Sequence, residues 1–486
     1  MIILHEYPLS IVDHIGFKRC STALQPSFKV VSRNTIKEDI MKIYESKKEV
    51  TMKFMEDNEG RVAITTDMWT TSNQKKGFMA ITAHYIDASW TLQSRILKFF
   101  HVLCPHTKEK LCQVLFDCLL HWNITKKIST VTLDNCSTNN AMIDVLLEKL
   151  DSSSLILSGS LIHMRCAAHV LNLVVNAGLQ LVKRSVDKIR ESVMFWRATP
   201  KREEKFEEAA RHLLISYSKK LVLDVATRWN SIYLMLEIAI VYKSIFARLL
   251  RKETSKYKIA ITEEDWEFAR ELCGRLKIFY EVTEELSDRK YPTINLFFPS
   301  ICNVRLALGQ WFSSSNSQIK LMASSMIAKF DKYWDVISGV VGVATVLDPR
   351  YKMKLIEFYF PKIYVDRFAV ESERILQLVY DLVFEYQSRG NSCSRGVESS
   401  GNLSQDMSEG GSQDPLAAYD LFIKNDKRAK NLKVKYELDH YLDEDVLPRS
   451  KDFDILMWWK VNGIKYPILQ AIARDFLGYT SIYSCI

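Results

Sequence analysis

The chain has 486 residues, of which 47% are hydrophobic and 26% are charged, and its formal net charge is +8. This length exceeds one compact core and predicts about two to four domains of roughly 100–200 residues, while the composition is that of a globular rather than a disordered protein. The mild positive charge permits DNA binding through phosphate neutralisation but does not require it.

No segment of the sequence is typical of a membrane span or of a secretory signal. The longest strongly apolar stretch, Val336–Leu347, is interrupted by Ser338 and Gly339, whereas a spanning helix needs about 20 apolar residues. Charged side chains such as Glu6 and Asp13 break the apolar core that a signal peptide would need. We therefore expect no membrane association. Ten cysteines without framework spacing then predict reduced thiols, and the lack of any C-x2-C pair predicts no zinc.

Residues 1–60 are predicted to form a mostly helical N-terminal segment. Apolar residues recur at helical spacing in Ile40, Ile43, Val50 and Phe54, with charged residues between them. Thr35, just before this stretch, is expected to be the N-cap.

Residues 61–180 alternate between β-rich and helical patterns. Strands are expected over 62–67, 78–86, 92–102, 128–133 and 161–165, and helices over 108–122, 137–150 and 167–179. The order β-β-β-α-β-α-β-α predicts a mixed sheet flanked by helices, which is also the order of a ribonuclease-H-like core.

The rest of the chain is predicted to be helical except for one linker. Residues 181–387 form a helical insertion domain, with helices expected over 186–196, 203–214, 231–250, 265–287 and 321–333. The fold class is therefore α/β, a mixed-sheet core interrupted by a large all-α insertion. The Ser/Gly-rich residues 388–414 predict a disordered linker.

Residues 415–486 combine a basic run with an apolar C-terminal segment. The run over 424–435 predicts a solvated face, or alternatively contact with phosphate or a nuclear import signal. Pro467 suits the first turn of a helix whose apolar residues share one face. The face from Trp458 to Leu477 is too apolar for an exposed tail, so we expect it to pack against a partner, in the same chain or in another.

Asp67 and Asp134 each end a predicted strand, at the edge where ligands collect in open sheets with alternating helices. If the two strands are neighbours, the two carboxylates could hold Mg2+ or Mn2+, and a pair of such ions can cleave a phosphodiester. The alternative is that Asp134 only begins a turn and caps a helix.

Several short stretches resemble, in order, the conserved blocks of hAT-family transposases. The matching stretches are Thr65–Thr70, Thr132–Asn135 with Asn139 and Asn140, Arg165–Leu173, Asp224–Ser231, Leu347–Lys352 and Trp458–Leu469. They extend over nearly the whole chain and are most similar to the plant RICESLEEPER/DAYSLEEPER-like group with a BED zinc finger. The resemblance implies a ribonuclease-H-like catalytic core, interrupted by a helical insertion, that cuts DNA with two metals held by Asp, Asp and Glu.

The resemblance also implies residue roles. Asp67 and Asp134 fall on the first two carboxylates, and Cys166 and His169 on a block that supports the active site. Trp229, between Arg228 and Asn230, falls on a tryptophan that stacks on a flipped base, although a core role is an equal alternative. The residues that fall on the self-association region are Trp458, Trp459, Tyr466, Pro467 and Leu469.

Departures from the family pattern decide the predicted function. No Glu follows Tyr466, so the third catalytic carboxylate is missing, and Met1–Glu6 resembles sequence that normally follows the zinc finger. The missing carboxylate would be replaced only by chance by a residue of the helical insertion such as Glu281, Glu284 or Glu285. We therefore expect any Mg2+ or Mn2+ to bind weakly at Asp67 and Asp134.

The sequence thus predicts a domesticated or degenerate transposase-like protein of the nucleus, truncated at both ends, which binds DNA, forms a homodimer and does not cleave. It predicts no small-molecule substrate. Two alternatives stay open, an active metal-dependent transposase or nuclease and a protein-interaction scaffold without DNA binding.

Overall fold

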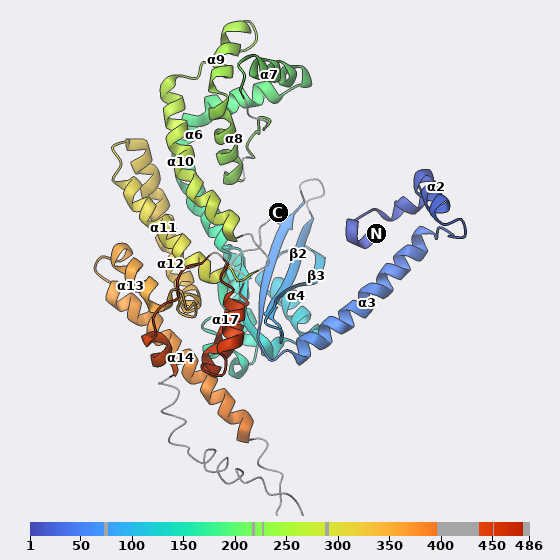
Figure 1. Ribbon diagram of the computed structural model, residues 1–486, viewed down its shortest axis with the longest axis vertical. Helices are drawn as coiled ribbons and strands as arrows, with labels where there is room; N and C mark the ends of the chain where they lie inside the picture. The colour runs from blue at the N-terminus through green and yellow to red at the C-terminus, as the bar shows by residue number, and fades with distance from the viewer. Residues whose placement is uncertain are drawn as a thin grey trace, which may run out of the picture. The chain divides into compact units, whose positions relative to one another are not determined.

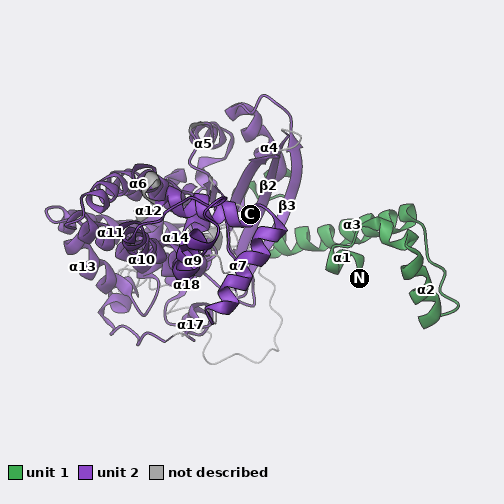
Figure 2. Ribbon diagram, turned by 90° about the horizontal axis from the view of Figure 1, so that it is seen from above, with its two compact units in different colours: residues 1–59, 119–125 green, residues 60–118, 126–486 purple. Residues whose placement is uncertain are grey.

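The computed structural model describes residues 1–71, 76–215, 219–225, 228–286, 291–395, 437–450 and 452–479. The chain divides into two compact units (Figure 2), one of residues 1–59 and 119–125 and the other of residues 60–118 and 126–486. In the described part of the chain, no helix is both long and apolar enough to cross a bilayer.

The first unit is helical, as predicted for residues 1–60. Its elements are α1 (Ile2–His5), η1 (Leu9–Asp13), α2 (Ile15–Leu24) and α3 (Arg33–Asp57). The expected N-cap at Thr35 is wrong, because Ser32 occupies that position and its hydroxyl accepts a hydrogen bond from the Thr35 backbone N–H at 3.2 Å. Arg33 in the first turn forms an ion pair with Asp13.

A five-stranded mixed sheet lies in the second unit (Figure 1). Its strands are β1 (Val62–Thr70), β2 (Gly77–Ile86), β3 (Leu92–Val102), β4 (Ile128–Leu133) and β5 (His163–Arg165). The order is β3-β2-β1-β4-β5, with β1 to β3 antiparallel and β4 parallel to both β1 and β5. Helices α4 (Lys108–His121) and α5 (Ser137–Lys149) connect the strands, which confirms the predicted α/β fold class.

Burial explains the different sequence patterns of the strands. Every residue of β4 is buried, as expected for a parallel strand in the middle of a sheet with both faces covered. The edge strand β3 is instead mostly exposed or half-buried: only Leu97 and Val102 are buried, and the apolar Ile96 and Phe99 are exposed.

The helical part contains nine helices among the described residues between 167 and 395. They are α6 (Ala167–Arg197), α7 (Pro200–His212), α8 (Trp229–Val241), α9 (Lys243–Lys252), α10 (Glu263–Leu286), α11 (Ile294–Phe312), α12 (Ser317–Val346), α13 (Lys352–Ile363) and α14 (Phe368–Arg395). The predicted helices at 167–179 and 186–196 form one continuous helix, α6, and the one at 231–250 is interrupted at Tyr242. Helix α14 covers 388–395, the start of the expected linker; residues 396–414 and the basic run 424–435 lie outside the described residues.

Helix α12 runs back from the helical part to the sheet, where it contacts α6 and β5. A Cβ atom at Gly178 of α6 would lie 2.6–2.7 Å from side-chain atoms of Met322 and Met326, so only glycine permits this close approach. At the sheet, the guanidinium of Arg165 in β5 lies 5.3 Å from the ring centre of Tyr333 in α12. Helix α12 therefore connects the helical part to the sheet.

The C-terminal segment contains α17 (Ile455–Asn462) and α18 (Pro467–Leu477) and packs on the end of α12. The Trp459 indole N–H donates to the Leu347 carbonyl at 2.9 Å, and the Tyr441 hydroxyl donates to the Val346 carbonyl at 2.9 Å. The Lys352 ammonium donates to the Glu444 carbonyl at 2.8 Å. The apolar face predicted to need a partner thus finds one in its own chain.

Replacing Trp459 tests this packing. We expect Trp459→Ala to lower the free energy of unfolding by about 3–5 kcal/mol, because a fully buried indole and its hydrogen bond are lost. Urea unfolding followed by circular dichroism measures the change. The control is Val370→Ala in α14, where the side chain is 68% exposed; equal effects of the two variants would contradict the packing described.

Candidate active site

Parallel pairing of β1 with β4 places Asp67 beside Asp134. Thr65 pairs with Thr132; Asp67 lies two residues further along β1, and Asp134 directly follows the end of β4, so the period of two directs both side chains to the same face. The prediction that the two strands are neighbours is confirmed. The prediction that Asp67 ends its strand is wrong, because β1 continues to Thr70 by pairing with β2 alone.

The loop after β4 and the start of α6 surround Asp134. Asn139 donates from its side-chain amide to the Asp134 carbonyl at 3.1 Å, and Nδ1 of His169 lies 3.8 Å from Oδ1 of Asp134. The Cys166 backbone N–H donates to the Leu133 carbonyl at 2.9 Å, which ties the start of α6 to the end of β4. The side chain of His169 is 29% exposed.

Electrostatics make Asp134 an unfavourable place for a lone negative charge. Burial raises the pKa of the Asp134 carboxyl, nearby His169 lowers it, and the charge of Asp67 raises it further. Mutual repulsion of this kind is what a bound divalent cation would relieve, and carboxylate oxygens are the ligands that Mg2+ and Mn2+ prefer. The two side chains therefore suit one such cation.

Cys166 lies at the start of α6 and is 5% exposed. Burial raises the pKa of its thiol to about 12; the backbone N–H groups of His169 and Ala168 act against this shift, and the charges of Asp134 and Asp67 add to it. Since a thiol binds a metal as the thiolate, these surroundings favour the predicted supporting role of Cys166 and His169.

No third acidic side chain is brought to the pair within the described ranges. In this part of the chain, no group of three or more His, Cys, Asp or Glu side chains is arranged to hold a metal ion. Glu281 lies 3.6 Å from Lys277, and Glu285 accepts a hydrogen bond from Ser300 at 2.8 Å.

Asp475 in α18 is also acidic, but it lies elsewhere. Its carboxylate accepts hydrogen bonds from the Arg61 backbone N–H at 2.7 Å and from the Tyr386 hydroxyl. Arg61 is six residues before Asp67, a distance of about 20 Å along an extended strand. Asp475 therefore fastens α18 to the opposite end of β1.

The described residues of the block Asp224–Ser231 lie before and in the first turn of α8, where the Ser231 hydroxyl donates to the Val225 carbonyl at 3.1 Å. Both oxygens of Asp224 accept from Nε of Arg190, at 2.9 and 3.0 Å, an ion pair that the sequence did not reveal. The Trp229 ring is 4% exposed and meets Phe279 edge-on at 6.1 Å, which favours the core role over base stacking. Arg228 is exposed and Asn230 is half-buried, so only Arg228 is fully presented to solvent.

The residues predicted for self-association are mostly inside the chain. Trp459, Tyr466 and Leu469 are at most 1% exposed, whereas Trp458 is half-buried and Pro467 is exposed. The first three therefore act through the fold and do not form a contact surface. Three apolar side chains that the sequence analysis did not single out are exposed nearby: Met457 at 53%, Val461 at 70% and Ile464 at 99%.

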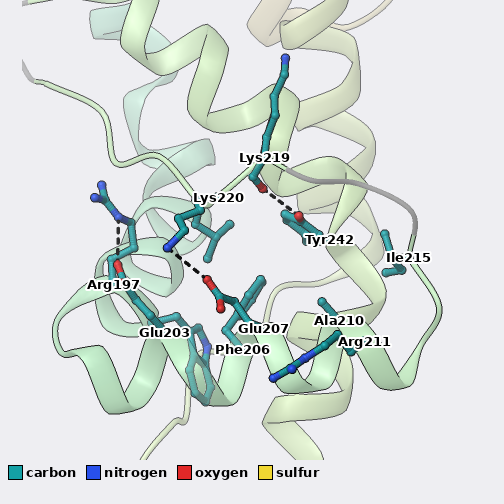
Figure 3. A pocket seen from close by; sticks show the side chains of 12 residues that line it. Arg197, Glu203, Phe206, Glu207, Ala210, Arg211, Ile215, Lys219, Lys220 and Tyr242 are labelled. Atoms are coloured by element: carbon teal, nitrogen blue, oxygen red, sulfur yellow. Dashed lines mark hydrogen bonds and ion pairs between the residues drawn. The ribbon is translucent and has the colours of Figure 1, made fainter.

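A cavity of about 300 Å³ is lined by the end of α6, by α7 and residues that follow it, and by Tyr242 between α8 and α9 (Figure 3). Aromatic side chains, among them Phe206 and Tyr242, line it together with several charged ones. Arg197 lies 3.6 Å from Glu203, and Lys220 lies 3.5 Å from Glu207. None of the predicted site residues lines this cavity.

Family models cover most of the chain. Residues 65–161 match the ZBED1 RNase-like domain and residues 164–275 the ZBED1 RNase-like helical domain. Residues 295–386 match the hAT-like transposase RNase-H fold, and residues 437–482 the hAT family C-terminal dimerisation region. The mixed sheet with its Asp pair is thus the core of a transposase-like protein. The model that matches residues 295–386, from α11 into α14, is described by the RNase-H fold; the sequence analysis placed these residues in the insertion.

Curated plant proteins are similar over 98% of the chain. Identity is 37% to a putative AC transposase of Zea mays, of which the chain spans 59%, and 37% to zinc finger BED domain-containing protein RICESLEEPER 2 of Oryza sativa subsp. japonica, of which it spans 67%. It is 34% to zinc finger BED domain-containing protein DAYSLEEPER of Arabidopsis thaliana, of which it spans 66%. The chain therefore belongs to the hAT transposase-like family, as the sequence analysis predicted.

The raised pKa of Asp134 predicts how stability depends on pH. Its pKa is higher in the folded than in the unfolded state, so the charged carboxylate destabilises the fold above that pKa, and the penalty disappears as pH falls below the ordinary carboxyl range near 4. We expect Asp134→Asn to raise Tm by roughly 1–3 °C at pH 7. Calorimetry from pH 7 down to pH 4 measures the effect.

The control for this variant is Asp366→Asn, which removes an exposed carboxylate and should leave Tm unchanged. A lower Tm for Asp134→Asn at pH 7, or a gain that grows as pH falls, would contradict the proposed repulsion between the two carboxylates.

Proposed function

We propose that this chain is a domesticated or degenerate hAT transposase-like protein that acts in the nucleus, binds DNA, associates with itself and does not cleave. The observation that carries the proposal is the in-register pair Asp67 and Asp134, to which no third carboxylate is added among the described residues. The pair suits a role in holding DNA phosphate through a cation better than a role in cutting it.

Charge balance supports the absence of cleavage. Two divalent ions beside a phosphodiester bring four positive charges, and two carboxylates offset only half of them. The second ion would then be held weakly, and the two-metal mechanism needs both ions to stabilise the attacking and the leaving oxygen. Loss of one catalytic group commonly costs factors of about 10^3 or more. One weakly bound Mg2+ or Mn2+ at Asp67 and Asp134 is the expected occupancy.

Charge also supports DNA binding. The net charge of +8 favours contact with phosphate. Arg228 is exposed at the start of α8, and no ion pair holds it among the residues that the structure describes. A protein that binds DNA mainly through such contacts loses affinity steeply with added salt.

Binding and cutting can be tested together on one DNA. We expect the chain to retain a labelled duplex on a filter at about 50 mM salt and to lose it by about 200 mM, because displaced counterions drive the association. With Mg2+ or Mn2+ present, we expect no nicks in a supercoiled plasmid.

The control for the nicking assay is the variant Asp67→Ala. Metal-dependent nicking that this substitution abolishes would replace the proposal with the alternative of an active nuclease or transposase. Failure to retain DNA at low salt, with an intact oligomer, would favour a protein-interaction scaffold.

The contact surface for self-association is proposed to be the exposed apolar face of α17 and the turn after it. Met457 and Val461 are four residues apart and therefore share a helix face, and Ile464 follows in the turn. The matching family region is described by its role in dimerisation. Exposed apolar side chains grouped in this way mark a contact with another surface.

Val461→Glu tests this surface. We expect it to shift the chain from dimer to monomer in light scattering coupled to size exclusion, because a charge would be buried without a partner in the contact. The matched control is Val365→Glu, at a position that is 76% exposed outside this segment. An unchanged dimer with Val461→Glu would exclude α17 from the contact.

A further inference from the structure

Four aromatic rings lie on the sheet beside Asp67. Cross-strand pairing places Asp67, Ala80 and Phe99 in one row, and Trp69, Phe78 and His101 in the next. All six side chains share one face of the sheet, because residues two apart on a strand point the same way. The aromatic row is therefore about 7 Å from the row of the carboxylate.

The rings touch one another and form a continuous surface, here called the aromatic platform (Trp69, Phe78, Phe99 and His101). The ring centres of Phe78 and Phe99 are 5.7 Å apart with an angle of 16° between their planes, and Trp69 lies 5.5 Å from Phe99 and 6.2 Å from Phe78. His101 lies 5.5 Å from Phe78. Contacts across three strands hold the rings in a fixed arrangement.

The platform is open to solvent. Phe99 is 59% exposed and Trp69 is 39% exposed; His101 is exposed and Phe78 half-buried. Further along the same face, by contrast, Thr65 and His84 are buried and hydrogen-bonded at 3.0 Å. On β1 and β2 the face therefore changes from covered to open near the row of Asp67, whereas on β3 Ile96, which pairs with Thr82 in the row before, is already 70% exposed.

The chemistry of the platform favours nucleobases over a protein partner. It consists of rings, with no exposed Leu, Ile, Val or Met side chain in the two described rows, and every base offers a π-face to such rings. In sequence, the charged residues that flank the strands of the platform at this end are mainly basic: Lys76 before β2, and Lys108 and Lys110 after β3, against Glu109 after β3 and Asp67 one row away. Rings bordered by cations complement a strand with bases on one side and phosphates on the other.

We propose that the aromatic platform stacks one or two unpaired bases of a DNA strand whose phosphate lies beside Asp67. The distance of about 7 Å between rows equals about two stacked nucleotides, so a base that follows a phosphate at Asp67 reaches the rings. The inference rests on the proposed DNA binding and adds to it that single-stranded or unpaired DNA is the preferred form at this face.

The test measures binding of fluorescein-labelled oligothymidine of about 20 nucleotides, and of a duplex of the same length, by anisotropy at low salt with Mg2+ present. We expect Phe99→Ala to weaken oligothymidine binding about tenfold and duplex binding less than twofold. Phe99→Trp, which keeps an aromatic ring, should retain the affinity. Phe99→Leu, which keeps only an apolar side chain, should lose as much as Phe99→Ala.

The matched control is Phe384→Ala in α14, where the ring is 72% exposed and not part of the platform; its affinity should equal that of the wild type. The inference is overturned if Phe99→Ala or Phe99→Leu binds oligothymidine like the wild type. It is also overturned if these variants change the oligomeric state instead of DNA affinity, because the platform would then be a protein contact.

Binding by the wild-type chain distinguishes failure of the proposed DNA binding from failure of the platform. Should it bind neither DNA at any salt concentration, the proposed function fails together with the platform. If it binds both DNAs and the Phe99 variants bind equally well, DNA binding stands and only the role of the platform is lost.

Discussion

Parallel pairing of β1 with β4 is the constraint on which the site depends. The pair Thr65 and Thr132 sets the register, and because side chains alternate with a period of two, it brings Asp67 and Asp134 to one face. A slip of one residue would send one carboxylate to the opposite face of the sheet. The separate parallel pairing of β4 with β5 starts α6 next to Asp134, with Cys166 as its N-cap residue and His169 in its first turn.

A second tie holds the C-terminal segment to the core. The segment Leu347–Lys352 follows α12. Its Leu347 and Pro349 carbonyls accept hydrogen bonds from the Trp459 indole and the Leu447 backbone N–H, and the Lys352 ammonium donates to the Glu444 carbonyl. Asp348, fully buried, is neutralised by Arg350 and accepts from Asn295 at 2.8 Å. Trp459 is thus buried in the fold, and only its exposed neighbours Met457 and Val461 are free to contact another molecule.

The sequence predicted the strands well because their apolar runs are short and bounded by turn residues. It predicted helix ends less well: a helix at 231–250 was expected to be continuous, but α8 ends at Val241 and α9 begins after Tyr242. Periodicity continues across such a break because both helices bury an apolar face. The cap at Ser32 was missed because Ser32 and Thr35 are both good cap residues, and only the backbone geometry selects one.

The site was predicted in part, and the limits are physical. Strand order and register place Asp67 beside Asp134. The sequence suggested this neighbourhood because each aspartate stands at the end of a predicted strand. Burial was not readable from the sequence: Trp229 and Trp459 are inside the fold, although aromatic residues in conserved blocks suggested surfaces. The aromatic platform was equally hidden, because Trp69, Phe78 and Phe99 belong to three strands and meet only through their cross-strand pairing.

The position of an acidic residue along a strand decides what it can do. Asp475 is buried in the fold, and its charge is matched by the Arg61 backbone N–H, the Tyr386 hydroxyl and the Arg61 guanidinium 3.7 Å away. It therefore stabilises the junction of α18 with the start of β1. Asp67, six residues later, stands where the sheet face opens and where the rings begin. One strand thus carries a structural contact at its covered end and, at its open end, a carboxylate beside a surface suited to a base.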